Sequence, residues 1–140
     1  MSINPAPDLD AAMVLGMAST AIPFARSNTS QAERWLRILL LHGEAGTALQ
    51  ALGVSEAPLE ELTEHSDRAD GGQRPARGDV VARVGQAASE LARARGAQSV
   101  ATRDILRAVM DVYGSDFSDV LRAHGTDREE VLERLEPAPA

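Results

Sequence analysis

The stretch "WLRILLLHGEAGTALQALG" at residues 35–53 is followed by a similar stretch, "ILRAVMDVYGSDFSDVLRAHG", at residues 105–125. At an offset of 70, Trp35-Leu36-Arg37 aligns with Ile105-Leu106-Arg107. At an offset of 72, the leucine and glycine near the end of the first stretch align with those of the second. Such internal similarity indicates duplicated supersecondary units that bury their apolar stripes against one another. We therefore predict two repeats in pseudo-twofold relation.

Composition favours an all-α fold for these repeats. The chain has 140 residues, the length of one domain, and is 44% hydrophobic but only 3% aromatic. Abundant Ala and Leu suit helices better than a sheet rich in β-branched and aromatic side chains. The absence of cysteine excludes disulfides, thiol catalysis and cysteine-based zinc sites, which suits the cytoplasm.

The second block shows the three-and-four apolar spacing of amphipathic helices. The predicted helices cover residues 80–96, 102–114, 116–124 and 127–135, with Thr102 and Asp127 as caps. The predicted inward stripes are Val80, Val81, Val84, Ala87, Ala88 and Leu91 for the first helix and Ile105, Leu106, Val109 and Met110 for the second.

The first block repeats this order. Its opening helix has the predicted inward stripe Leu9, Ala12, Met13 and Met17, and Pro23 should end or kink it. A Ser30-x-x-Glu33 capping box should start the second helix. A third at 45–52 and a short fourth at 58–62 complete repeat one (8–62), which a linker at 63–78 separates from repeat two (79–135).

Charge and hydropathy exclude two classes of partner. The formal net charge is −7, and all fourteen basic residues are arginine, so nucleic acid is not an expected partner. No apolar run approaches the ~20 residues of a membrane helix, and the N-terminus lacks the layout of a signal peptide. We expect no membrane association.

Residues 82–110, "ARVGQAASELARARGAQSVATRDILRAVM", resemble the amino-terminal double-repeat domain of the Clp AAA+ chaperones. The quoted stretches of both repeats fit that family's second and third helices, and the resemblance spans about residues 8–135. No G-x-x-x-x-G-K-[ST] loop occurs, so the chain resembles the recognition domain without its ATPase.

The resemblance implies a non-catalytic binding module without a cofactor. Its ligand would be a peptide, a marked protein substrate or a Clp AAA+ chaperone, and it would serve as an adaptor or a sequestering protein. The alternative is a small helical protein that recruited this fold as an enzyme, a ligand-binding protein or an antibiotic-resistance factor for a small molecule or cyclic peptide.

In some relatives the domain binds phosphoarginine through a glutamate near the start of each repeat's second helix. Glu33 matches that position in repeat one, while repeat two has Arg103, which would repel a guanidinium. Glu33 has a second interpretation as part of the capping box. Relatives also open each repeat with an aromatic residue, but Pro7 and Arg77 stand here.

Five of the six candidate ligand-binding residues lie in repeat one. Trp35 is a core residue or lines a groove beside Glu33. In the alternative function, a pocket would lie between the repeats near Trp35, Met13, Met17 and Glu33. No catalytic or metal-binding motif is present, and the histidines at predicted helix ends suit the carbonyl dipole better than a metal. The candidates are therefore Glu33, Arg34, Trp35, Met13, Met17 and Arg103.

Overall fold

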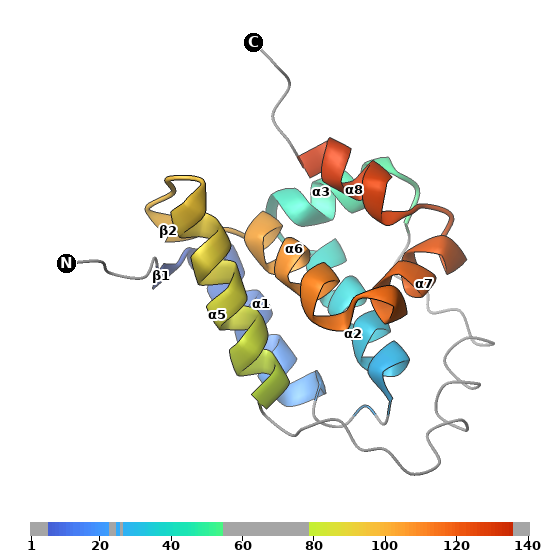
Figure 1. Ribbon diagram of the computed structural model, residues 1–140, viewed down its shortest axis with the longest axis horizontal. Coiled ribbons are helices and arrows are strands. Elements are labelled where there is room, and N and C mark those ends of the chain that lie inside the picture. Colours follow the sequence, from blue (N-terminus) through green and yellow to red (C-terminus); the bar gives the residue numbers. More distant parts are fainter. Residues whose placement is uncertain (1–5, 23–24, 26, 55–78, 136–140) are drawn as a thin grey trace.

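The computed structural model describes residues 6–22, 25, 27–54 and 79–135, which are mostly helical. These residues form helices α1 (Leu9–Ala21), α2 (Asn28–Leu40), α3 (Gly43–Ala51), α5 (Asp79–Ala94), α6 (Thr102–Tyr113), α7 (Ser115–Ala123) and α8 (Arg128–Leu135). Two short strands, β1 (Ala6–Pro7) and β2 (Ser99–Val100), complete the described elements (Figure 1). The predicted all-α class is confirmed.

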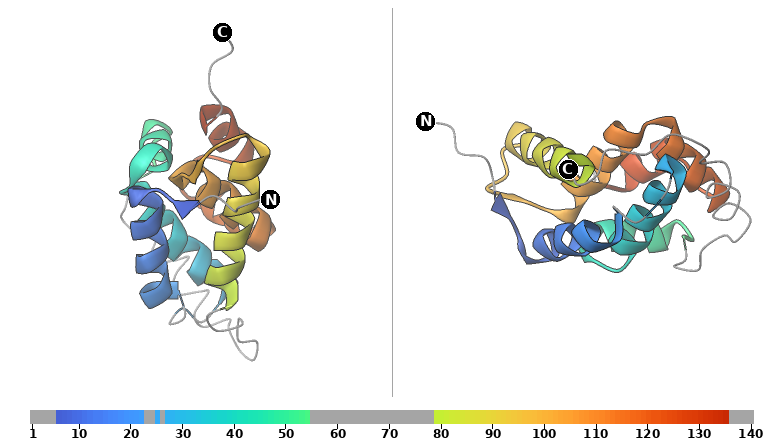
Figure 2. Two further views of the ribbon diagram at one scale, coloured as in Figure 1. Left: turned by 90° about the vertical axis from the view of Figure 1, so that its left-hand side faces the viewer. Right: turned by 90° about the horizontal axis from the view of Figure 1, so that it is seen from below.

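The helices lie in two layers (Figure 2). Helices α1, α2 and α3 form one layer, and α5, α6, α7 and α8 form the other. Between the layers, α2 packs on α6 and α7, α3 packs on α6 and α8, and α1 lies beside α5. A two-residue parallel pairing of β1 with β2 joins the start of α1 to the second layer, and the Asp8 N–H donates to the Val100 carbonyl oxygen at 2.8 Å.

One hydrophobic cluster fills the space between the layers and holds side chains from all seven described helices. Trp35 of α2 and Phe117 of α7 are its largest fully buried side chains. All four residues of the inward stripe predicted for α6, Ile105, Leu106, Val109 and Met110, are buried, as predicted. In α5, Val80, Val81, Val84 and Ala88 are buried, and Ala87 and Leu91 pack against the cluster.

The turn between α2 and α3 is tight and depends on two glycines. Gly43 has φ of +62°, a conformation that side chains with a Cβ rarely adopt. A Cβ at Gly46 would lie 2.5 Å from the carbonyl oxygen of Leu40, so only glycine lets α3 approach the end of α2 this closely. The sequence predicted that Gly43 ends the second helix, but in the structure it is the first residue of α3.

The stripe predicted to face inward on α1 is wrong. Leu9 is 77% exposed, Met13 46% and Met17 42%, whereas Ala11, Val14 and Ala18 are fully buried. The helix is apolar around most of its circumference, so periodicity alone does not select a face. The structure buries the smaller side chains and leaves the large ones outside. The end of α1 at Ala21, before Pro23, agrees with the sequence prediction.

Two predicted caps are wrong and one is confirmed. Helix α2 starts one turn earlier than predicted, because the Ser27 hydroxyl accepts the Ser30 N–H at 3.0 Å. Thr102 is the first residue of α6 and caps α3 instead: its Oγ1 accepts the N–H of Ala45 at 3.1 Å. Asp127 caps α8 through the N–H of Glu130, as predicted.

The predicted helix at 58–62 and the predicted linker at 63–78 lie outside the described residues. In the part of the chain that is described, no helix combines the length and the apolarity needed to cross a membrane.

Candidate functional site

Large apolar side chains are exposed on one part of the described surface. They are Leu9, Met13 and Met17 of α1, spaced four residues apart, and Leu41, the residue that follows α2. Residues four apart lie on the same face of a helix. These side chains therefore form a continuous apolar strip along α1 that faces away from the second layer and leads to the end of α2.

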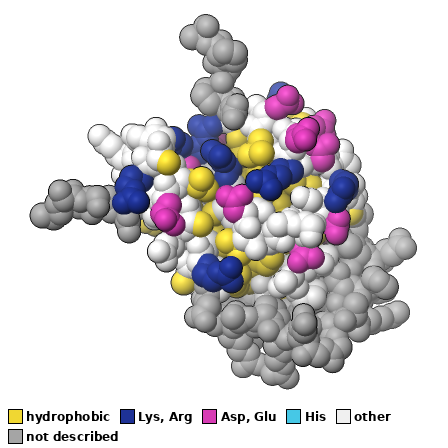
Figure 3. All heavy atoms as spheres, viewed as in Figure 1, with side chains coloured by type: hydrophobic (Ala, Val, Ile, Leu, Met, Phe, Trp, Pro, Cys, Tyr) yellow, Lys and Arg dark blue, Asp and Glu magenta, His cyan; other side chains and the backbone are white. Residues whose placement is uncertain are grey.

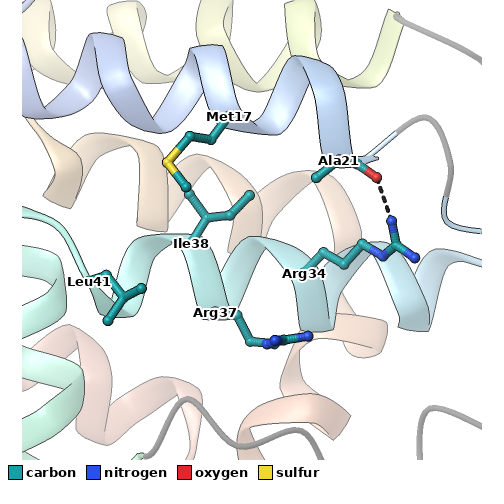
Figure 4. A pocket seen from close by; sticks show the side chains of 6 residues that line it. All are labelled: Met17, Ala21, Arg34, Arg37, Ile38 and Leu41. Carbon is teal, nitrogen blue, oxygen red and sulfur yellow. Dashed lines mark hydrogen bonds between the residues drawn. The ribbon is translucent and has the colours of Figure 1, made fainter.

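A groove lies at the carboxyl end of this strip, between α1 and α2 (Figure 4). It has a volume of about 340 Å³ and is lined by Met17, Ala21, Arg34, Arg37, Ile38 and Leu41. Met17 and Ala21 come from the last turns of α1, and Ile38, with Leu41 just beyond the helix, comes from α2. The groove is thus built within the first layer and not between the layers.

Arg34 has a structural role in forming one side of this groove. Its guanidinium donates to the carbonyl oxygen of Ala21 at 2.8 Å (Figure 4). Ala21 is the last residue of α1, and α1 has no basic residue of its own in its last turn. Because carbonyls at a helix end lack internal partners and carry partial negative charge, Arg34 caps α1 and fixes it against α2.

Arg37 lies one turn further along α2 and is exposed. No carboxylate of the described residues pairs with it, since the ion pairs found there involve other side chains. The six lining residues include two cations and no anion. The groove therefore joins an apolar surface of Met17, Ile38 and Leu41 to local positive charge in a chain of net charge −7.

Glu33 of α2 is buried against the second layer and does not line the groove. Both of its carboxylate oxygens are 3.0 Å from Nε2 of His124, the residue that ends α7. Each side chain is 4% exposed. The carboxylate thus binds an imidazole from the other layer, and its place in a Ser30 capping box, one of the two interpretations given from sequence, is not observed.

Trp35 also lies in the core, in agreement with the first of its two interpretations. Its Nε1–H donates to the Tyr113 hydroxyl at 3.0 Å, and this hydroxyl donates to Oε1 of Gln31 at 2.6 Å. Burial raises the pKa of Tyr113 to about 12. The three side chains satisfy one another's polar groups in the interior, as buried polar groups require, and present nothing to a ligand.

Arg103 contacts neither the groove nor Glu33. Its Nε lies 3.8 Å from Oε1 of Glu44, so it bridges α6 to α3. Of the six candidates, the structure brings Met17 and Arg34 together in the groove and places Met13 one turn away on the same apolar strip. Glu33, Trp35 and Arg103 lie in three other environments.

Sequence reasoning missed Arg37, Ile38 and Leu41 as groove residues. A signal was present in the run Leu39-Leu40-Leu41, because three successive helical positions cannot all face one core. Leu39 and Leu40 are buried, and Leu41 is 57% exposed. Within the described ranges, no three His, Asp or Glu side chains gather in a way that could hold a metal ion.

Comparison with known proteins identifies no relative by sequence. The chain matches no protein-family model and no curated protein. The function must therefore be argued from the residues themselves and from the arrangement of the groove.

Proposed function

We propose that this chain is a non-catalytic protein-binding module of the Clp amino-terminal type, which serves a AAA+ protease system as an adaptor or a sequestering protein. The binding site in this proposal is the groove between α1 and α2, which is lined by Met17 and does not extend to Leu9 at the other end of the apolar strip. Glu33 is not part of it, because its carboxylate is buried against His124.

The order and packing of the helices support the duplicated architecture on which this proposal rests. Helices α1, α2 and α3 are followed by α5, α6 and α7 in the order expected of a second copy. The contacts between the layers are reciprocal: α2 packs on α7, and α3 packs on α6. An exchange of the two copies would convert one of these contacts into the other.

The observation that carries the functional proposal is the exposed apolar surface at the groove. Met17 is 42% exposed and Leu41 57%, next to Ile38, and both lie beside two arginines. A contiguous patch of exposed apolar side chains that is rimmed by polar residues is typical of an interaction site. An aliphatic and thioether surface of this kind adapts to varied peptide side chains, since methionine is flexible and polarisable.

The test is affinity capture from a lysate of the source cells with tagged protein, followed by identification of the bound proteins. Wild-type protein should recover a Clp ATPase or a set of client proteins, and Met17→Glu should lose them because a carboxylate in the groove disfavours apolar contact. Leu9→Glu is the matched control: Leu9 is 77% exposed on the same helix but two turns from the groove.

Equal recovery by wild type and Met17→Glu would contradict the assignment of the groove. Recovery of no protein, together with a co-purified small molecule, would contradict the proposal as a whole and favour a small-molecule function for this fold.

A further inference from the structure

The charge of the groove specifies the kind of segment that fits it. Its apolar side chains are flanked by Arg34 and Arg37, and no acidic residue lines it in the described part of the chain. The face over α5, α6 and α7 differs, because arginine and acidic side chains are interspersed there (Figure 3). Among the described residues, the groove is thus a place where apolar surface coincides with positive charge that has no acidic partner.

Both arginines retain donors for a ligand. A guanidinium has five N–H groups in a planar fork that matches a carboxylate. Arg34 directs one nitrogen to the Ala21 carbonyl, and Arg37 has no carboxylate partner among the described residues. Arg34 and Arg37 are three residues apart, so their side chains lie on one face of α2.

The size of the groove sets the length of its occupant. Arg34 and Leu41 are seven positions apart, which along a helix corresponds to about 10 Å, or two turns. A helical segment two to three turns long therefore spans the groove, with apolar side chains toward Met17, Ile38 and Leu41 and carboxylates along the arginine side.

A second copy of this chain does not present such a segment from its described residues. Its most acidic helix, α8, carries Glu129, Glu130 and Glu133. However, the apolar residues Val131 and Leu135 of α8 are buried in the core, so its apolar face is already occupied. The described helices of this chain therefore do not supply the complementary segment, and the charge of the groove fits an acidic helix of another protein.

We propose that the groove between α1 and α2 binds an acidic amphipathic helix of a partner protein, whose carboxylates pair with Arg34 and Arg37. This inference rests on the proposed protein-binding function and adds the chemical class of the partner segment.

The test measures binding of three labelled helical peptides by fluorescence polarisation. All carry leucine at positions i, i+4 and i+7, and the flanking residues are glutamate, glutamine or lysine. The glutamate peptide should bind several-fold more tightly than the glutamine peptide, and the lysine peptide should bind most weakly. Arg37→Gln should weaken binding of the glutamate peptide by about 1.5-fold to fivefold, the range for an exposed ion pair, and leave binding of the glutamine peptide unchanged.

Arg107→Gln is the matched control. Arg107 aligns with Arg37 in the second copy, is also exposed, and lies on α6. Its replacement should leave all three affinities unchanged. Because Arg37 and Arg107 are both exposed, both variants should keep the unfolding free energy of the wild type, which urea denaturation verifies.

Equal affinity for the three peptides, or an equal effect of both arginine variants, would overturn the acidic class of partner. The groove-dependent capture of proteins described above would then still stand, so failure of this inference is distinguishable from failure of the proposed function. Binding of phosphatidylglycerol vesicles through Met17 and Arg37, without binding of the glutamate peptide, would also overturn the inference in favour of a lipid surface.

Discussion

Glu33 of α2 and His124 at the end of α7 meet in the interior, with both carboxylate oxygens 3.0 Å from the imidazole Nε2. These residues are ninety-one positions apart and belong to different layers. The pair therefore connects the first half of the chain to the second at a point where each side chain is only 4% exposed.

Loss of this contact should destabilise the fold strongly. His124→Ala leaves the carboxylate of Glu33 buried without its partner, a change that costs about 3–5 kcal/mol where a buried pair is broken. Urea denaturation gives the free energy of unfolding. His42→Ala is the control, because His42 is half-buried at the start of α3 and its side chain makes no capping hydrogen bond. A loss below 1 kcal/mol for His124→Ala would show that the pair contributes little.

Stability should fall at alkaline pH because of Tyr113. Burial raises its pKa to about 12, above the unfolded value of about 10. The folded state thus holds the phenolic proton more tightly than the unfolded state does. The contribution of protonated Tyr113 to stability is fully present below pH 10 and is lost as the pH rises toward 12. By linkage, the free energy of unfolding should decrease by roughly 2 kcal/mol over this interval.

This alkaline transition can be assigned to one residue. The chain has one tyrosine, no lysine and no cysteine, so no other side-chain type present has its ordinary pKa between about 10 and 12. Tyr113→Phe should lower stability overall, because Trp35 and Gln31 lose a partner, but should remove the slope. An unchanged slope in this variant would exclude Tyr113 as its source.

Gly46→Ala should destabilise the turn between α2 and α3. The new Cβ would lie 2.5 Å from the Leu40 carbonyl oxygen, so the backbone must shift at a cost of about 1–3 kcal/mol. Gly16→Ala is the matched control on the exposed part of α1, where a Cβ meets nothing within 4 Å. It should raise stability by about 0.5–1 kcal/mol, since alanine favours helix. Thermal unfolding of both variants measures the difference, and the same sign for both would refute the close approach at Gly46.

Thr102→Val should cost about 1–2 kcal/mol by removing the cap of α3. The valine fills the same volume but leaves the Ala45 N–H without its acceptor at a buried position. Thr102→Ser keeps the hydroxyl, so its free energy of unfolding in chemical denaturation should stay close to that of the wild type. If the two variants lose equal stability, the effect comes from packing and not from the hydrogen bond.

The sequence predicted best where one face of a helix is clearly apolar. In α6 the other face carries Arg103, Arg107 and Asp111, so the face with Ile105 and Val109 is the one that packs inward. In α1 the stretch from Leu9 to Ala21 holds only one charged residue, Asp10, and either face fits the helical period. Packing against α2, α5 and α6 decides between them, and local periodicity does not contain that information.

The caps and the site depend on distant partners in the same way. Ser27 and Ser30 are both suitable caps by residue type. The structure uses Ser27, whose hydroxyl accepts the Ser30 N–H, and the Glu33 carboxylate contacts His124 from α7. Thr102 likewise serves α3 and not its own helix. Arg34 and Met17 were identified as candidates, but their meeting requires the orientation of α1 that the sequence left undecided.

The cap that Arg34 places on α1 means that the groove is a discontinuous epitope. A synthetic peptide of α1 alone would lack the guanidinium at its carboxyl end, and a fragment of α1 and α2 would expose Trp35 and Leu36 to water. Overlapping peptides of this chain should therefore fail to reproduce the binding surface. Antibodies or selected binders directed at the groove must be raised against the folded domain.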